Sequence, residues 1–472
     1  MKLPRALVAV LAASLLAAGC SGSDDDTAAG PDAVATVESQ PETPVLDTGA
    51  DTVDPALPAT DPSAAPTGSP APGAPGDSAA PGTTPAPGAS AATDAVSRTK
   101  DGVAAVTGGG KKPAAGPAVV KLGGVFPLSG PLGSVGTAMM ESVQAVIAQT
   151  NAAGGVRGTK FELVVEDDQF DPVRGKAVVQ KLIEQDKVFA FAGIFSPFTT
   201  QAALPVIRAA KVPVFPSGSD DREFGEPMLF PVTNPCGRQM AGNVQHLVSE
   251  RKLTKLAVVY VNVEAVSNCT KYFTAVAKKL GADVVFNGAT APGAPDCASR
   301  MVAARASGAE ALIVITENLG TVKCLQAKDQ LGWNVPVSIS YNNTDDPVIL
   351  RGAGKAGEGM LSSSPFTGAS SAAFAEQCGA IKKFYPESRL QFFSIVGCLG
   401  TKLLIEGVKI GGFERTGLIS ALESGRTFSF GDLVPPLSYA NDEHLPYDLT
   451  ATVQVTNGTW VRVGKLYTPA GV

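Results

Sequence analysis

The stretch that decides the fold is residues 189–219, FAFAGIFSPFTTQAALPVIRAAKVPVFPSGS, which predicts a strand, a helix and a second strand in succession. Phe189–Phe195 is an apolar run without charge, typical of a strand that is covered on both faces. Ser196 offers a helix N-cap and Pro197 a favoured first helical position, so we expect a helix to start there. A second apolar run, Val212–Phe215, ends in the polar segment Pro-Ser-Gly-Ser.

The ends of these two strands predict half of a small-molecule site. In an open parallel sheet, ligands bind beyond the carboxyl ends of the strands. Ser196, Ser217 and Ser219 follow two such ends, beside a helix start whose free N–H groups favour an anionic or carbonyl group. The alternative is that these polar residues only cap the helix and form a turn.

Residues 1–20 have the charge order of an export signal, with two basic residues before an apolar run that is too short to span a bilayer comfortably. The last five, LAAGC, resemble the end of a bacterial lipoprotein signal, in which Cys20 becomes the lipidated first residue of the mature chain. A plain secretory signal with a chance cysteine is the alternative, and either signal exports the protein. No later segment is apolar enough to predict a membrane span, so the lipid would be the only anchor.

Residues 21–117 are expected to form a disordered linker. They contain no Phe, Tyr or Trp and are dominated by Ala, Pro, Gly, Ser, Thr and Asp, which offer too little apolar surface to fold. Twelve acidic and no basic residues lie between Ser21 and Ser97, so the net charge of −6 mainly reflects this linker. The rest of the chain has no dense Lys/Arg patch with interleaved aromatic residues, and we expect no nucleic-acid partner.

Residues 118–472 alternate strand-like and helical runs in two series, which predicts an α/β fold with two doubly wound lobes. Helices at Ala372–Phe384 and Phe392–Ile410 follow, and the tail alternates like two antiparallel strands joined at Asn457-Gly458. The expected strands are Val119–Val125, Phe161–Glu166, Phe189–Phe195 and Val212–Phe215 in the first series, and Leu256–Tyr260, Val284–Phe286, Ala311–Thr316 and Val335–Ser340 in the second.

Three segments carry a resemblance to a known family: LGGVFPLSGPLGSVG at 122–136, NAAGGVRGTKFELVVEDDQFDP at 151–172, and the stretch 189–219. They resemble the type I periplasmic substrate-binding proteins of ABC importers, especially the branched-chain amino acid (Leu/Ile/Val) group. The resemblance extends over residues 119–472 and implies two α/β lobes, joined by a three-strand hinge, that close on a ligand. It implies that lobe one is 118–255 plus 366–437 and that lobe two is 256–365 plus 438–472.

In lobe one, the resemblance implies that the carboxylate-binding positions are Ser196 with Pro197, Ser217 and Ser219. Hydroxyls and backbone N–H groups at a helix start can hold a carboxylate without a buried cation, whose desolvation would be costly.

In lobe two, the matched loops place Glu317, Tyr341 and Asn342 at the ligand. Relatives that bind amino acids have an aromatic residue and an acid there in the opposite loops, so an amino-acid ligand is an open question. Glu317 would pair with an ammonium group and Tyr341 would stack on an apolar body. The alternative for Glu317 is a solvated acid at a helix start.

Besides Cys20, six cysteines in an exported chain predict up to three disulfides, from fifteen possible pairings. The order of the predicted elements favours three pairs, with free buried thiols as the alternative: Cys236–Cys269, Cys297–Cys324 and Cys378–Cys398. No CxxC pair or His companion indicates zinc, and the acidic run at 166–171 lacks EF-hand spacing, so we expect no metal.

Catalytic motifs are missing from the sequence. The two histidines, His246 and His444, each stand alone, and neither a Gly-x-Ser-x-Gly elbow nor an HExxH motif occurs. We therefore expect no enzyme and no cofactor. The expected function is that of a monomeric, lipid-anchored, extracytoplasmic protein that captures a small polar or carboxylate-bearing solute and delivers it to an ABC permease. A ligand-sensing receptor that feeds a signalling partner is the alternative; a hydrolase would need a nucleophile–base pair that the sequence does not offer.

Overall fold

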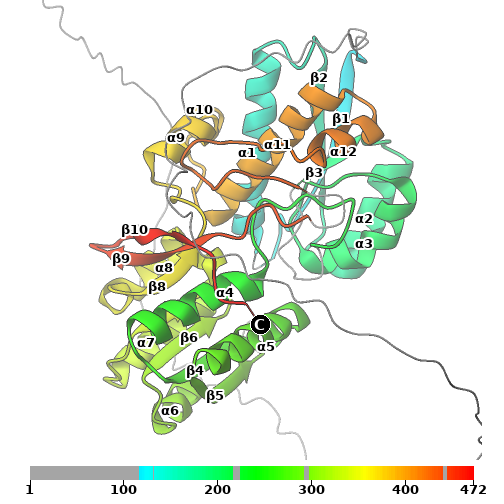
Figure 1. The fold of residues 1–472 in the computed structure, drawn as a ribbon. Helices are drawn as coiled ribbons and strands as arrows, with labels where there is room; N and C mark the ends of the chain where they lie inside the picture. Colours follow the sequence, from blue (N-terminus) through cyan, green and yellow to red (C-terminus); the bar gives the residue numbers. More distant parts are fainter. Residues whose placement is uncertain (1–115, 131, 216–223, 292–296, 440–443, 472) are drawn as a thin grey trace, which may run out of the picture. The chain divides into compact units, whose positions relative to one another are not determined.

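The computed structural model describes residues 116–130, 132–215, 224–291, 297–439 and 444–471 (Figure 1). The predicted signal sequence with Cys20 and nearly all of the predicted linker lie outside these residues, as do Ser217 and Ser219. No helix within the described part of the chain is both long and apolar enough to cross a membrane.

The first sheet has three parallel strands in the order β2-β1-β3, formed by Lys160–Asp167, Val119–Phe126 and Ala190–Ile194. Helices cover both of its faces (Figure 1). On one side lie α2 (Pro172–Glu184) and α3 (Pro197–Ala210), and on the other α1 (Gly133–Ala152) and α11 (Phe392–Gly411), with α12 (Arg415–Leu422) packed on α11.

Side chains of β3 pack against the helices on both faces of this sheet. In β3, Phe191 and Ile194 pack with the apolar residues of α2 and α3, whereas Ala190 and Ala192 pack in the cluster that contains α1 and α11. All four side chains are completely buried. A strand without an exposed face needs an uninterrupted apolar sequence, which is what the run after Val188 provides.

The second sheet has seven strands in the order β10-β9-β8-β7-β6-β4-β5. The five strands from β8 to β5 run parallel, and the C-terminal hairpin of β9 and β10 adds to β8 in antiparallel fashion, as the Asn457-Gly458 turn predicts. The strands are β4 (Lys255–Val261), β5 (Asp283–Thr290), β6 (Ala311–Ile315), β7 (Val337–Ile339), β8 (Leu361–Ser364), β9 (Thr450–Thr456) and β10 (Thr459–Tyr467).

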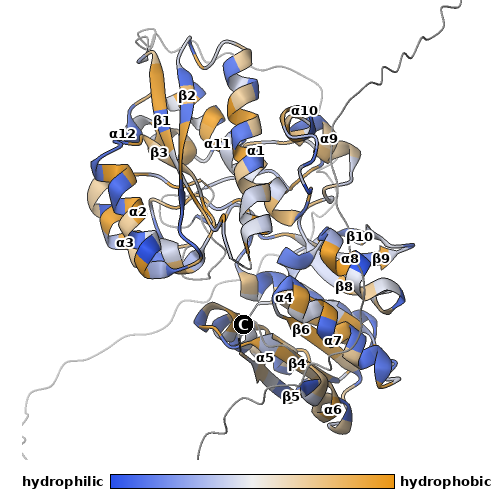
Figure 2. Cartoon of the chain, turned by 180° about the vertical axis from the view of Figure 1, so that it is seen from behind, coloured by the Kyte–Doolittle hydropathy of each residue, from blue (hydrophilic) through white to orange (hydrophobic). Residues whose placement is uncertain are grey.

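Two separate apolar clusters cover the faces of this sheet. In β4, Leu256 and Val258 pack with α4 (Cys236–Gln245) and α5 (Glu264–Lys279), while Ala257 and Val259 pack with α6 (Ala298–Ala306) and α7 (Asn318–Gln330). Figure 2 shows β1 and β4 as predominantly hydrophobic. The α/β class with two helix-covered sheets is thus confirmed.

The short elements that complete the described chain are η2 (His246–Glu250, a π-helical turn), η3 (Tyr341–Asn343), α8 (Pro347–Ala353), η4 (Gly354–Gly357), α9 (Ala372–Cys378) and α10 (Ala380–Phe384).

Helix α4 belongs with the second sheet, although it precedes residue 255. It packs against α5 and β8, and the Cys236–Cys269 disulfide joins it to α5. A Cβ on Gly242 would lie 2.8 Å from the Thr450 side chain, so the helix approaches β9 closely. We therefore propose that the first lobe boundary lies before Cys236 rather than at residue 255.

Two predicted elements differ in the structure. Of the predicted strand Val212–Phe215, only Val214 forms β-bridges, to Phe191 and Leu229, because the neighbouring Pro213 has no N–H to donate to a ladder. The predicted helix over 372–384 is two helices, α9 and α10, interrupted at Gly379.

Candidate functional site

The start of α3 is built as its sequence predicts. Ser196 has an extended backbone and its Oγ accepts a hydrogen bond from the backbone N of Thr199 at 3.3 Å, while Pro197 occupies the first helical turn. Ser196 is completely buried and Pro197 is partly buried. The predicted capping role of Ser196 is therefore present, and a ligand role for its hydroxyl stays a prediction.

A buried carboxylate fixes this helix start to the end of β2. Asp168 is completely buried, and its two oxygens accept from Thr199 Oγ1 at 2.6 Å and from the backbone N of Phe170 at 3.0 Å. Burial raises the pKa of Asp168, although these hydrogen bonds act in the opposite direction. Gly175 of α2 permits the approach, since a Cβ there would lie 2.2 Å from Thr199 Oγ1. The hydrogen bond between Thr199 and Asp168 thus joins side chains that are 31 residues apart in the chain.

The adjacent Asp167 holds the loop that follows β1. Its carboxylate accepts from the backbone N of Leu128 at 2.9 Å and from the Ser129 hydroxyl at 2.7 Å. Burial acts to raise the pKa of Asp167, but these hydrogen bonds, that of the Gln169 N–H and the charge of Arg174 outweigh it, so the pKa is lowered. Asp167 is thus an anion that would repel a carboxylate placed beside it.

In the second sheet, the loops after β6 and β7 carry the other predicted residues. Glu317 occupies the N-cap position of α7 and is partly buried. Tyr341 is 2% exposed at the start of η3, and Asn342 beside it accepts from the Ser340 hydroxyl at 2.6 Å. These placements agree with the predicted strand ends, and the contacts of a ligand with these three residues stay a prediction.

An amide that the sequence analysis missed joins these two loops. Asn343 is 3% exposed, and its Nδ2 donates to the Thr316 carbonyl at 2.9 Å and to Thr321 Oγ1 at 3.0 Å. A second hydrogen bond between the same two loops runs from Asn318 Nδ2 to Asp346 Oδ2. The sequence indicates a polar loop after β7, but it does not predict which asparagine of this loop is buried and contacts the loop after β6.

Two consecutive acids close the loop after β7. Asp346 caps α8 by accepting from the backbone N of Val348 at 2.7 Å; burial raises its pKa, opposed by that bond and by the charges of Arg351 and Arg389. Burial raises the pKa of Asp345 to about 6, and its Oδ2 accepts from the backbone N of Ala369 at 3.1 Å. Both acids follow the predicted ligand residues Tyr341 and Asn342 closely in the chain, and both use their carboxyls to hold the loop.

Aromatic side chains link the two sets of loops. The ring of Tyr341 lies 5.5 Å from that of Phe392, which lies 5.3 Å from Phe393 at the start of α11. The Phe393 ring is in turn 4.6 Å from that of Phe195, the residue before Ser196. Residues of the first and second sheets are thus brought together through apolar rings, which the sequence analysis did not predict.

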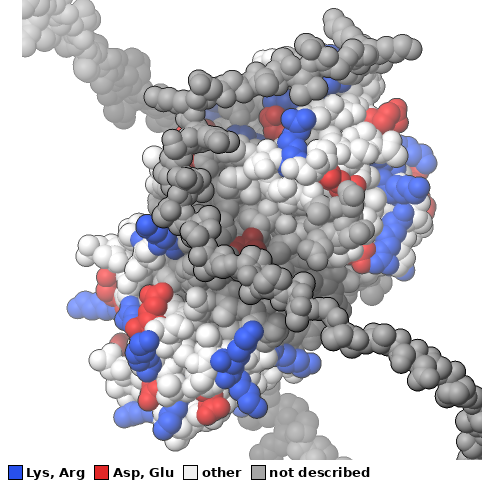
Figure 3. Space-filling view, in the orientation of Figure 1, with Lys and Arg blue, Asp and Glu red and all other residues white. Residues whose placement is uncertain are grey.

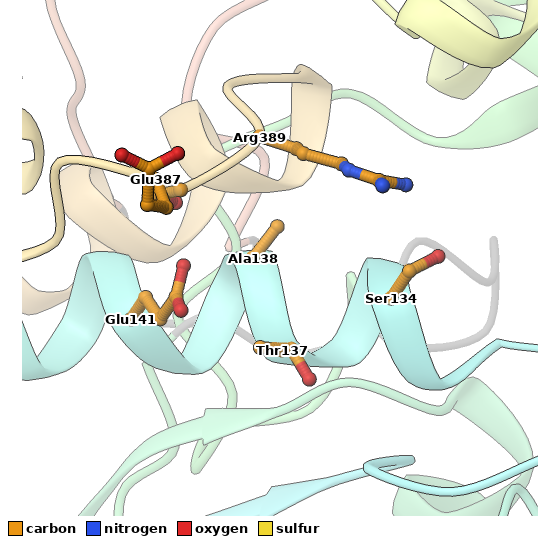
Figure 4. A pocket seen from close by; sticks show the side chains of 7 residues that line it. Ser134, Thr137, Ala138, Glu141, Glu387 and Arg389 are labelled. Carbon is orange, nitrogen blue, oxygen red and sulfur yellow. The ribbon is translucent and has the colours of Figure 1, made fainter. Parts of the chain in front are cut away.

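A pocket of about 190 Å³ lies between α1 and the loop before α11 (Figure 4). Arg389 extends over Ser134, whereas Glu141 and Glu387 lie together towards the other end (Figure 4). Because Glu387 and Arg389 are exposed, water and salt screen these charges, and we assign no ligand to the pocket. It is lined by Ser134, Thr137, Ala138, Glu141, Glu387, Ser388 and Arg389.

On the face that Figure 3 displays, Lys and Arg side chains are interspersed with Asp and Glu. Among the residues whose positions are described, no group of three or more His, Cys, Asp and Glu side chains could hold a metal ion. The structure forms three disulfides, in the pairs that the sequence analysis favours: Cys236–Cys269, Cys297–Cys324 and Cys378–Cys398.

Comparison with known sequences identifies the family. The model of the periplasmic binding protein family matches residues 119–459. An amino acid binding protein of Pseudomonas aeruginosa is 32% identical over 164 residues, a match that covers 34% of this chain and only 44% of that protein. The Leu/Ile/Val-binding protein homolog 7 of Brucella abortus is 25% identical over 321 residues, covering 63% of this chain and 80% of that protein.

Solved structures share the fold. A fatty acid ABC transporter substrate-binding protein from Thermomonospora curvata superposes with a TM-score of 0.68 at 21% identity, covering 75% of this chain and 95% of that one. A branched chain amino acid ABC transporter from Thermus thermophilus with bound valine gives a TM-score of 0.67 at 18% identity, covering 75% and 98%. The chain therefore belongs to the periplasmic binding protein family, with the type I fold that the sequence predicts, and within that family it is similar to a Leu/Ile/Val-binding protein homolog.

Proposed function

We propose that this chain is the extracytoplasmic solute-binding component of an ABC importer. It captures a small carboxylate-bearing or related solute, closes its two lobes over it and delivers it to a membrane permease. Family membership over residues 119–459 is the observation that carries the proposal. The family consists of binding proteins, so the chain's work is capture rather than catalysis.

The candidate residues fit a ligand held by uncharged groups on one side. Ser196 and the start of α3 face the polar end of a solute in this proposal, together with Ser217 and Ser219, which are proposed from the sequence alone. The loops with Glu317, Tyr341 and Asn342 provide the opposing wall. One structural relative is named as a fatty acid transporter protein, and others were solved with 4-hydroxybenzoate, benzoate or valine bound. These ligands all carry a carboxyl group, which supports an acid as the solute, but they differ in the rest of the molecule.

A thermal-shift screen against amino acids, amides, short carboxylates and aromatic acids tests the proposal. A solute present at a hundredfold its Kd should raise the unfolding free energy by about 2.7 kcal/mol. Ser217→Ala and Ser219→Ala should weaken binding of that solute. Unchanged affinity in both variants would remove the proposed carboxylate site, and a screen without any stabilising solute would contradict the binding function.

We also propose that Cys20 carries the lipid that anchors the protein outside the cytoplasmic membrane, with residues 21–117 as the tether. In this proposal the tether allows the binding protein to reach its permease. Cys20→Ser should move the exported protein from the membrane fraction to the soluble fraction. A variant that stays with the membrane would contradict the lipid anchor.

A further inference from the structure

The chain passes between the layers of the first sheet and those of the second sheet three times. The first crossover, residues 229–235, leads to the start of α4. The second crossover, residues 365–371, leads from β8 to α9. The third crossover, residues 437–449, leads from the segment after α12 to β9, and its residues 440–443 lie outside the described part of the chain. When two lobes close, the chain has to bend at or near such connections.

Two buried phenols connect the first crossover to the third. The Tyr439 hydroxyl donates to the Pro231 carbonyl oxygen at 2.6 Å. The Tyr447 hydroxyl donates to the carbonyl oxygen of the next residue, Val232, at 2.8 Å. Both tyrosine side chains come from the third crossover and both acceptors from the first, so these bonds hold the two crossovers side by side.

Further contacts lie on either side of the phenols. In the first crossover Asn234 is completely buried, and its Nδ2 donates to the Leu449 carbonyl at 2.9 Å. Towards the other end, His444 Nδ1 lies 2.6 Å from the Leu229 carbonyl oxygen, which can only accept, so this nitrogen carries a proton. The backbone N of His444 also donates to the Phe224 carbonyl at 2.9 Å. The contacts therefore extend along the whole first crossover.

Proline explains why side chains make these connections. Pro231 and Pro235 in the first crossover and Pro446 in the third have no N–H to donate to a backbone ladder. Burial raises the pKa of both Tyr439 and Tyr447 well above the ordinary value of a phenol. Both hydroxyls therefore keep their protons far into the alkaline range and remain donors.

Aromatic packing adds to the hydrogen bonds. The Phe230 ring of the first crossover stacks on the His444 ring at 4.4 Å and meets the Tyr439 ring edge-on at 5.5 Å. Phe230 and Tyr439 are completely buried, and His444 is 1% exposed. Separating the two crossovers would expose these rings to water as well as break the hydrogen bonds, and both losses are unfavourable.

The second crossover is attached to other parts of the chain. The backbone N of Ala369 donates to Asp345 Oδ2, in the loop after β7, at 3.1 Å. The backbone N of Thr367 donates to the Leu433 carbonyl at 3.1 Å. These bonds can persist or break without any change in the contacts between the first and third crossovers.

We infer that the first and third crossovers move as one unit, the paired crossover, and that the second crossover moves independently of it. Tyr439 and Tyr447 are the side chains that keep the paired crossover together. The inference goes beyond the proposed function, because it concerns the motion of the two lobes whichever solute they capture. Its consequence is that loosening the paired crossover at one point loosens all of it.

Hydrogen exchange of the purified full-length protein without solute, resolved to single amides by mass spectrometry, tests the inference. Tyr447→Phe removes the bond to Val232 and keeps the ring. Because the paired crossover opens as a unit, exchange should rise about tenfold at the Phe230 amide in the first crossover and at the Ser438 and His444 amides in the third. The backbone N of each of these three residues donates to a carbonyl oxygen, so its exchange reports on opening.

A second variant and a control locate the effect. Tyr439→Phe removes a different bond of the same unit, to Pro231, and should raise exchange at the same amides. Tyr385→Phe is the matched control, because its hydroxyl donates to Gln144 Oε1 at 2.7 Å and lies outside the crossovers. That control should leave exchange in all three crossovers unchanged. Circular dichroism checks the folding of each variant.

The second crossover separates the inference from a general loss of stability. Its Thr367 and Ala369 amides should keep their wild-type exchange rates in both Tyr439→Phe and Tyr447→Phe. An equal rise at these two amides would overturn the inference, since all three crossovers would then open together. A rise confined to the amides next to the replaced residue, or no rise in either variant, would overturn it as well, because the first and third crossovers would then move separately.

Discussion

In the first sheet, acidic side chains hold the loop after β1 and the start of α3, whereas in the second sheet a neutral amide joins two loops and disulfides join the covering helices. Asp168 binds the start of α3 to the end of β2 in the first region. In the second region, Asn343 joins the loops after β6 and β7, and disulfides join pairs of helices on both faces of the sheet. The first region, where one disulfide joins α9 to α11, should therefore be more sensitive to loss of charge, and the second, with two disulfides, should be more sensitive to reduction.

Removal of the Cys297–Cys324 disulfide should have the largest effect. The bond links α6 and α7 on one face of the second sheet and spans 27 residues. Replacing both cysteines by Ala should lower the free energy of unfolding by about 3–4 kcal/mol, because the unfolded chain loses a long loop constraint. Urea denaturation of the wild-type protein and the double variant measures this loss of stability.

Thiol titration of the denatured, unreduced protein provides the control for this prediction. Only Cys20 should react if all three pairs are formed, and not even Cys20 would react as a thiol if it is lipidated. Reactive thiols at Cys297 and Cys324, together with an unchanged denaturation midpoint, would show that the second region is not covalently stapled.

Loss of Arg415 should be the corresponding test of the first region. Its guanidinium donates to three carbonyl oxygens, of Val188 at 2.7 Å and of Phe189 and Ala210 at 2.8 Å each. Arg415→Ala leaves these acceptors without that partner, and the free energy of unfolding should fall by about 3 kcal/mol. The exposed Arg426→Ala is the control and should change stability by less than about 0.5 kcal/mol. Equal effects of the two variants would contradict the dependence on this charged, partly buried side chain.

Charge also affects the stability of the second region, through the carboxyl group of Asp345. The pKa of Asp345 is raised by burial to about 6, above the ordinary value of 3.8, so the folded state favours the protonated form. The stability that this group contributes is present below about pH 4 and is lost as the pH rises to about 6. Asp345→Asn keeps the shape and tolerates the positive φ of 63°.

The asparagine variant should therefore raise the free energy of unfolding by about 2 kcal/mol at pH 7.5 and change it little at pH 4. Denaturation of both proteins across this pH range measures the difference. A variant that is destabilised equally at both pH values would show that the ionised carboxylate of Asp345 is well accommodated, contrary to the pKa direction.

Local signals explain which parts of this fold could be predicted from sequence. Ser196 and Pro197 predict the start of α3 because the capping bond reaches only from Ser196 to Thr199, and apolar runs predict the strands of both sheets. Helix α4 was missed because its sequence, CGRQMAGNVQ, is largely polar and begins without a capping side chain. The break at Gly379 also has no strong local signal.

The site was less predictable because its side chains act across long separations. Asp168 meets Thr199 and Asn343 meets Thr316, pairs that only the folded sheets bring together. The ring of Phe195 likewise contacts the ring of Phe393, which comes from a distant segment of the chain. Strand order predicts that loops share an edge, but it does not predict which rings or amides meet there.

The smallest effect is expected at Ser196, where two roles can be separated. Ser196→Ala removes the acceptor for the Thr199 N–H and should cost about 1 kcal/mol of stability, whereas Ser196→Gly, also without the hydroxyl, should cost only a few tenths. If the hydroxyl binds solute, both variants lose affinity to the same extent despite their different stabilities. Wild-type affinity in both would leave Ser196 as a helix cap only, like Asp346 at α8 in the second region. Isothermal calorimetry and urea denaturation of the two variants therefore decide whether the two regions differ in ligand contact as well as in how they are held.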